Sequence, residues 1–163
     1  MEAANENPLR LVAYCGLYCG VCANRNRIPP HAKLLQEALR NEGMHSWYQY
    51  VPSMKHTFPT FWKFLDNLVA MDCTCRTGGG PPDCKIRECA KQNEVDTCPF
   101  CLEYPCSHIE RLAEHYVSII QDGKRLKKIG LNVWAKEQEE RAERSVVYSD
   151  TRIPWDNDAE PVL

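Results

Sequence analysis

The segment from Cys73 to Cys106 constrains the fold of this chain more than any other part of the sequence. Its 34 residues hold seven of the ten cysteines and are rich in glycine, proline and charged side chains. Its large aliphatic residues are Ile86, Val95 and Leu102 alone. Burial of so little apolar area cannot offset the conformational entropy that folding removes. The segment therefore needs covalent or coordinate cross-links to hold it.

The cysteines are expected to bind metal rather than to form disulfides. An even number would permit disulfide pairing, but the first ten residues, MEAANENPLR, lack the apolar centre of a secretory signal. No apolar run in the sequence is as long as a membrane-spanning helix. We therefore expect a cytoplasmic protein with no membrane partner. In that reducing compartment, dense cysteines more often hold metals.

The charge of the chain argues against polyanionic partners. The formal net charge is −2 at pH 7 when the cysteines are counted as neutral. A tetrathiolate zinc site adds about −2, so two such sites would bring the net charge to about −6. A negative chain has no general attraction for nucleic acid, and no nucleic-acid partner is expected.

A mainly α fold is expected, namely a small helical domain with irregular, cysteine-rich, metal-stapled loops. Residues 1–10 are predicted to form a flexible leader, residues 11–148 a single metal-binding domain, and residues 149–163 an extended tail from which Trp155 docks on the body. Apolar residues at helical spacing predict helices over residues 31–42, 60–71, 107–121 and about 131–146. Gly123 is interpreted as a helix stop, followed by a basic turn at residues 124–128.

The cysteine spacings predict metal sites. Cys98 and Cys101 form a C-x-x-C pair, which lets two thiolates bind one ion from a single turn, and two such pairs complete a tetrahedral Cys₄ cage. Ten cysteines suffice for two zinc ions, with two thiols remaining. His108 is the nearest histidine to this set. The candidate ligands are Cys15, Cys19, Cys22, Cys73, Cys75, Cys84, Cys89, Cys98, Cys101 and Cys106.

An iron–sulfur cluster is the alternative cofactor. Cys15, Cys19 and Cys22 have the three-then-two spacing that resembles the cluster-binding run of radical-SAM enzymes. Those enzymes need most of a (β/α) barrel of roughly 200 residues, and this chain is shorter and lacks alternating strands and helices. The N-terminal trio is instead expected to borrow a ligand from the long segment. That would join the two ends of the domain.

Four motifs, YCGLYCGVC, CKIRECA, CPFCLEYPC and IGLNVWAKEQEER, occur in this order within residues 13–142. In these motifs the chain resembles a prokaryotic cysteine-rich family, domain of unknown function 3795. The resemblance implies zinc binding and supplies no reaction. The family shows C-x-G-C-R where this chain has D-C-T-C-R. Cys75 therefore matches the pattern, whereas Cys73 lies one residue late and is the weakest of the candidate ligands.

Three functions remain open from the sequence. The first is a binding or adaptor module with structural zinc, which recognises a protein or small molecule through the aromatic region 47–62. The second is an iron–sulfur redox or sensing protein. The third is a metalloenzyme with an open zinc position, which requires a non-cysteine ligand or a water molecule. No catalytic residue is assigned.

Overall fold

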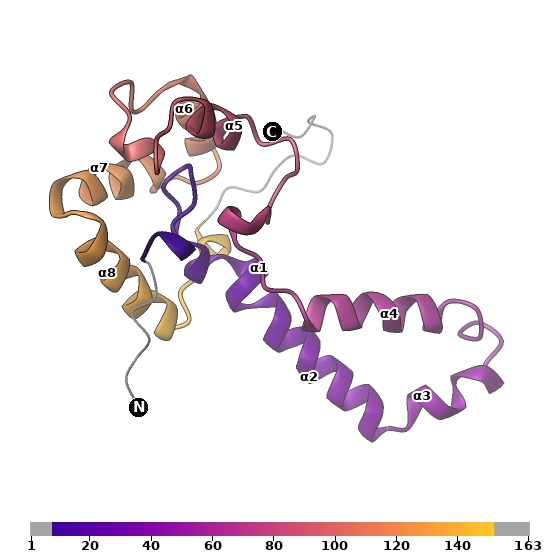
Figure 1. Ribbon diagram of the computed structural model, residues 1–163. Coiled ribbons are helices and arrows are strands. Elements are labelled where there is room, and N and C mark those ends of the chain that lie inside the picture. The colour runs from indigo at the N-terminus through magenta and orange to yellow at the C-terminus, as the bar shows by residue number, and fades with distance from the viewer. Residues whose placement is uncertain (1–7, 152–163) are drawn as a thin grey trace.

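The computed structural model describes residues 8–151 and is mainly helical. No β-strand forms within this range, where β pairing is limited to an isolated bridge between Val12 and Tyr18. The mainly α fold predicted from the sequence is thereby confirmed. Figure 1 shows two parts, a rounded body and an arm of two long helices that projects from it.

The arm contains α1 (Ala23–Asn26), α2 (Ile28–Asn41), α3 (Met44–Trp47) and α4 (Phe58–Val69). The body contains α5 (Lys85–Gln92), α6 (Ser107–Ala113), α7 (Ile119–Ile129) and α8 (Leu131–Glu143). Six short 3₁₀ helices complete the described chain, at Pro8–Leu11, Cys19–Val21, Tyr48–Tyr50, Cys75–Thr77, Cys98–Phe100 and Tyr148–Asp150.

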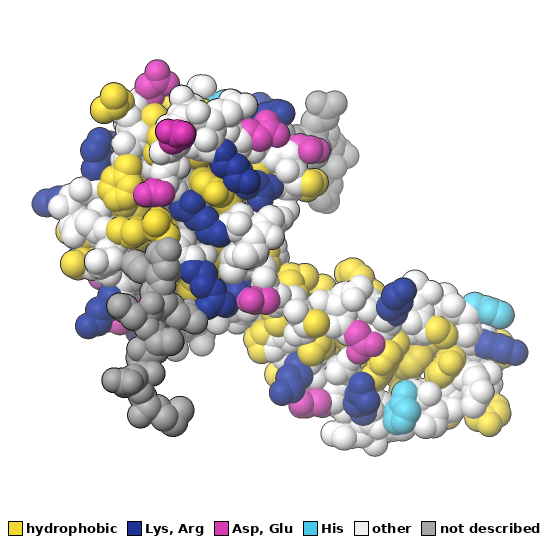
Figure 2. All heavy atoms as spheres, viewed as in Figure 1, with side chains coloured by type: hydrophobic (Ala, Val, Ile, Leu, Met, Phe, Trp, Pro, Cys, Tyr) yellow, Lys and Arg dark blue, Asp and Glu magenta, His cyan; other side chains and the backbone are white. Residues whose placement is uncertain are grey.

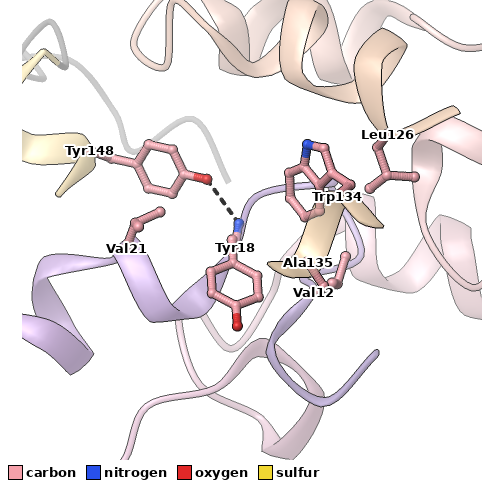
Figure 3. Packing of buried hydrophobic residues seen from close by; sticks show 7 residues of the cluster. All are labelled: Val12, Tyr18, Val21, Leu126, Trp134, Ala135 and Tyr148. Atoms are coloured by element: carbon pink, nitrogen blue, oxygen red, sulfur yellow. Dashed lines mark hydrogen bonds between the residues drawn. The ribbon is translucent and has the colours of Figure 1, made fainter. Parts of the chain in front are cut away.

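The core of the body joins the N-terminal loop to the last two long helices (Figure 3). Trp134 of α8 is fully buried and meets the Tyr18 ring edge to face, with ring centroids 6.0 Å apart. The Tyr18 backbone N–H donates a hydrogen bond of 2.9 Å to the hydroxyl oxygen of Tyr148. The remaining members of the cluster are Val12, Val21, Leu126 and Ala135. The apolar core therefore includes part of the N-terminal cysteine loop but takes no member from the segment of residues 73–106.

The arm has its own aromatic packing. Phe58 is buried, and its ring stacks on Tyr48 with centroids 4.7 Å apart and an interplanar angle of 21°. Trp62 packs against Phe58 at 5.6 Å. Leu65 is only 2% exposed between α4 and α2. These contacts hold two antiparallel helices together without any cysteine.

Prolines move two helix starts upstream of their predicted positions. The helix predicted over residues 31–42 is α2, which begins at Ile28 and takes Pro29 and Pro30 into its first turn. The helix predicted over residues 60–71 is α4, which begins at Phe58 with Pro59 in its first turn. Proline is favourable there because first-turn N–H groups have no intrahelical acceptor and its φ is already helical.

The helix predicted over residues 107–121 is wrong in its extent. The structure has two helices, α6 and α7, separated at residues 114–118. Gly123 does not end a helix but lies inside α7, and residues 124–128, predicted as a turn, are helical. A Cβ atom at Gly123 would lie 2.0 Å from the Tyr104 hydroxyl oxygen. Glycine is therefore required there for close packing.

The end of the body departs from the predicted extended tail. The last long helix, α8, ends at Glu143 rather than near residue 146, and Ser149 lies in a 3₁₀ helix. The rest of the predicted tail from residue 152 onward, with the docking of Trp155, lies outside the described residues.

Candidate metal centre

The N-terminal cysteine loop lies against the long cysteine segment, and the predicted sharing of an ion between them stays a prediction. The Cys98 backbone N–H donates to the carbonyl oxygen of Tyr14 at 2.7 Å. The fully buried Thr97 hydroxyl donates to the carbonyl oxygen of Ala13 at 3.0 Å. Gly16 has a φ of 94°, and a Cβ there would lie 2.8 Å from Pro99 Cγ. Gly16 is therefore needed for a backbone turn that packs on the second loop.

Arg76 forms a second link between the loops. Its Nε donates to the carbonyl oxygen of Val12 at 2.8 Å, and its Nη2 donates to the carbonyl oxygen of Asp96. The same guanidinium lies 4.1 Å from the centroid of the Tyr14 ring. Such stacking adds a cation–π attraction to the hydrogen bonds. One side chain thus connects three separate stretches of backbone.

Arg87 of α5 performs a similar role and was missed by the sequence reasoning. It is 8% exposed. Its Nη1 donates to the carbonyl oxygens of Gly79, at 3.0 Å, and of Cys75, at 3.5 Å. Its Nη2 donates to those of Pro81 and Pro82. The GGGPP run has many backbone carbonyl groups outside regular secondary structure, and these need hydrogen-bond donors. An arginine nearby, between two cysteines, was the signal in the sequence that a buried guanidinium would supply those donors.

The first group of neighbouring thiols surrounds Cys19. The pKa of the Cys19 thiol is raised to about 11, chiefly by burial and also by the nearby thiols of Cys75, Cys22 and Cys73, against a lowering hydrogen bond from the Cys75 backbone. That hydrogen bond joins the Cys75 N–H to Cys19 Sγ at 3.4 Å. Backbone N–H donors of this kind stabilise thiolate in metal sites. Cys73, the weakest candidate by motif, thus lies among these thiols.

The second group surrounds Cys98. The pKa of this thiol is raised to about 12, chiefly by burial and then by the thiols of Cys106, Cys89, Cys101 and Cys84, in that order of strength. The side-chain amide of Asn93 donates to Cys89 Sγ at 3.4 Å. Five of the predicted ligands are therefore neighbours at this side of the body.

Cys15 lies between the two groups. Burial raises the pKa of its thiol well above the usual range, and neighbouring thiols from both groups, Cys75 and Cys98, raise it further, as does Cys84. Cys15 and Cys19 therefore share Cys75 as a neighbour but differ in their other neighbouring thiols. Raised pKa values mean that Cys15, Cys19 and Cys98 are protonated thiols at neutral pH without a metal, which is the opposite of an activated nucleophile.

The cysteines are grouped without converging on a point. All ten lie within the described residues and are free thiols, with Cys19 buried, Cys89 exposed and the others half-buried. Among residues 8–151, no three cysteine, histidine, aspartate or glutamate side chains approach closely enough to hold a metal ion. His108 is exposed on the first turn of α6. The ten cysteines are compatible with metal binding, and their assignment as ligands stays a prediction.

An open depression lies beside the first group. It is lined by Asn24, Met71, Asp72, Cys73, Gly79 and Pro81, among others. On its arm side, the Arg25 guanidinium pairs with the Asp72 carboxylate. Solvent therefore has access to the side of the Cys19 group that faces the base of the arm.

The aromatic region 47–62 serves chiefly to pack the arm. Tyr48, Phe58 and Trp62 stack on one another, as described above. The Trp47 indole N–H donates to the carbonyl oxygen of Glu42 at 3.0 Å. Tyr50, at 78% exposed, and Phe61, at 40%, remain accessible to a partner.

Comparison with known proteins gives one family. Residues 11–111, more than half of the chain, match the family described as "Protein of unknown function (DUF3795)". No curated protein and no solved structure matches the chain. Within residues 8–151, none of the helices combines the length and the apolar character needed to cross a membrane.

Proposed function

The chain belongs to the DUF3795 family of proteins of unknown function, and from this premise we propose that it is a metal-binding protein whose ions are structural. The observation that supports the proposal is the grouping of nine of the ten free thiols into two neighbourhoods around Cys19 and Cys98, with Cys15 between them. Thiolates are the ligands that structural zinc sites prefer. The donor set therefore fits two zinc ions.

The neighbour relations suggest which cysteines share an ion. Cys19, Cys22, Cys73 and Cys75 form one proposed centre. Cys89, Cys98, Cys101 and Cys106 form the other, because these thiols interact most strongly with Cys98. Cys15 and Cys84 are the two thiols left over. Metal binding at either centre must displace thiol protons, so its apparent affinity rises with pH.

The ions supply the folding free energy that the loops lack. Structural zinc contributes about 10–16 kcal/mol of apparent free energy in small peptides. The loops between Cys73 and Cys106 bury few large aliphatic side chains, and their order otherwise rests on the arginine–carbonyl contacts. The proposed role of the whole protein is a binding or adaptor module in which a zinc-stabilised body carries the arm.

Elemental analysis of the full chain tests the proposal. Freshly purified protein should contain about two zinc ions per chain and be colourless, as two tetrathiolate sites require. If the protein instead contains iron and acid-labile sulfide and has a brown colour that dithionite bleaches, the zinc proposal is wrong and the iron–sulfur alternative is correct. A zinc ion with three protein ligands and an exchangeable water would instead favour the metalloenzyme.

A reducing, cytoplasmic location is part of the same proposal. Ten thiols in the free state are stable where the thiol pool is reducing. Alkylation under denaturing conditions without reductant, followed by mass spectrometry, should label all ten cysteines of protein that was kept metal-bound during purification from the cytoplasm. Disulfide-linked cysteine peptides in such protein would contradict this part of the proposal.

A further inference from the structure

The arm exposes large hydrophobic side chains that the body does not cover. Of the ten large hydrophobic residues that are exposed within the described part of the chain, four are scattered on the body and six lie on the arm. The six are Leu34, Leu35, Trp47, Tyr50, Phe61 and Phe64. Figure 2 shows hydrophobic side chains along the surface of the arm, at a distance from the body. A concentration of this kind on a protruding element marks an interaction surface.

Four of these residues lie on one face. One side of α2 exposes Leu34, Leu35 and Ala38, which are spaced three and four residues apart. They lie to one side of the residues of α2 that pack on α4. One side of α4 likewise carries the exposed Phe61 and Phe64 and the half-buried Leu68, next to the buried Phe58 and Leu65. Viewed along each helix axis, the two apolar sides are turned from the buried residues in the same direction. In an antiparallel pair, this places them on the same side of the arm, and they form one apolar face.

The opposite face of the arm is polar and closed. The Gln36 side-chain amide of α2 donates to the Asp66 carboxylate of α4 at 2.6 Å. The Arg40 guanidinium lies 5.0 Å from the centroid of the Trp62 ring. Lys33 and Glu37 approach each other at 3.9 Å along α2. The two faces therefore differ in chemistry, and only the apolar face lacks partners across the helices.

We propose that a second copy of this chain covers the apolar face, so that two arms form a four-helix bundle. The six residues Leu34, Leu35, Ala38, Phe61, Phe64 and Leu68 carry no charge, so a two-fold axis can place the face against itself without like-charge repulsion. Two layers of paired helices with apolar inner faces make the standard bundle core. The arm projects from the body (Figure 1), which leaves room for a second arm.

The size of the face sets the strength of the contact. Fourteen residues of α2 and twelve of α4 give helices about 20 Å long, side by side over about 20 Å of width. Two such faces bury about 800 Å² in total, which is the size of a weak, transient contact. The dimer should therefore be reversible, with a dissociation constant in the micromolar range.

Sedimentation equilibrium of the full, metal-bound chain tests the proposal. The parent protein should pass from monomer to dimer between about 1 and 200 μM. Phe64→Glu should weaken dimerisation at least about tenfold because it buries a charge in the interface. Leu34→Glu should do the same from the other helix. The matched control is Lys63→Glu, on the neighbouring position of α4 away from the apolar face, which should dimerise like the parent.

Folding is checked by helical circular dichroism and metal content, which should be the same in all variants because the substituted side chains are exposed. A parent chain that stays monomeric at the highest concentration overturns the proposal, even if a helix of another protein binds the face. A dimer that Phe64→Glu and Leu34→Glu leave intact overturns it too, because the copies then meet elsewhere. Metal content does not enter these outcomes, so the dimer and the metal proposal can fail separately.

Discussion

The body and the arm reach order by different physical means. The arm has no cysteine between residues 23 and 72, and it is held by aromatic and aliphatic packing around Phe58 and Leu65. The cysteine loops have little apolar area to bury, and the side chains of Arg76 and Arg87 bind backbone carbonyls there instead. This difference is the reason for proposing a metal in the body and none in the arm.

The two regions meet at a base that the cysteines flank. Cys22 immediately precedes the arm, and Cys73 follows it. Both are neighbours of Cys19. The two ends of the fifty-residue arm therefore lie beside the same group of thiols. The Arg25–Asp72 ion pair crosses the same base. A metal bound by the Cys19 group would fix the two ends of the arm on the body.

The largest expected effect comes from replacing both Cys98 and Cys101 by serine. The loss of one ion removes about 10–16 kcal/mol, which is comparable to or larger than the net stability of a domain, about 5–15 kcal/mol. The body should unfold at 25 °C, while α2 and α4 keep more amide protection than α7 and α8. Hydrogen exchange with mass spectrometry measures both regions in one experiment.

Cys84→Ser is the matched control because it makes the same chemical change at a cysteine left outside the proposed centres. It should retain two ions and melt within a few degrees of the parent. If the Cys98 and Cys101 double variant melts like the parent, metal does not hold that loop. If arm and body lose protection together, the two regions form one cooperative unit and the comparison is wrong.

Trp134→Ala should cost about 3–5 kcal/mol, as expected for the loss of a buried aromatic side chain. Trp134 is fully buried, with 0% of its surface exposed to solvent, and it packs edge to face on Tyr18. Its indole N–H is buried without an acceptor among the described residues. Trp134→Phe should therefore cost much less, because it removes that unsatisfied donor while keeping a ring.

Chemical denaturation followed by circular dichroism gives both free energies of unfolding. The metal content of both variants should stay at the parent value in the absence of denaturant. Equal losses for alanine and phenylalanine would show that the ring contact with Tyr18 contributes little to the body.

The sequence predicted those helices whose cause is local. The apolar spacing of α2 and α4 was sufficient to find them, with errors of two or three residues at prolines. Gly123 was misinterpreted because its requirement comes from Tyr104, nineteen residues away, whose hydroxyl occupies the space of a Cβ. The burial of Arg87 was missed although its acceptors are local, because the folding of the preceding loop, residues 79–82, around the guanidinium leaves no periodic pattern in the sequence.

The grouping of the cysteines could be predicted only in outline. Proximity of the N-terminal trio to the long segment was expected and is observed at Cys19 and Cys75. The sequence did not predict that Cys15 lies between the two groups of thiols rather than in the group around Cys19. The direction of each thiol depends on the packing of Gly16 against Pro99, and the spacing of cysteines along the chain does not contain that information. The projection of the arm depends on tertiary packing, which residue patterns do not contain.

Leu65→Ala should cost about 2–5 kcal/mol and affect the arm alone. The side chain belongs to α4, which packs on α2, and is only 2% exposed. Hydrogen exchange should show loss of protection in α2 and α4, with two metal ions still bound. Leu102→Ala, at a 99% exposed position of the body, is the control and should stay within about 0.5 kcal/mol of the parent. Metal loss in Leu65→Ala would mean that the arm is required to assemble the body.

The smallest expected effect concerns the ion pair that joins the last described turn of the body to the start of the arm. Arg27 immediately precedes α2, and its Nη1 and Nη2 donate to the two carboxylate oxygens of Asp150 at 2.5 and 3.1 Å. The Arg27 hydrogen bond holds the pKa of Asp150 below its ordinary value of 3.8. A lowered pKa in the folded state contributes stability above the unfolded value and loses it as the pH falls through the folded one.

Asp150→Asn should therefore lower the melting temperature slightly and by the same amount at pH 5 and pH 7, because both lie above the titration of this carboxyl group. The difference should shrink in about 1 M NaCl, since both side chains are exposed and salt screens them. Glu103→Gln, which removes one exposed carboxylate elsewhere on the body, controls for the change in net charge and should not alter the melting temperature. A difference that grows between pH 5 and pH 7 would show that another group, and not Asp150, controls the contact between body and arm.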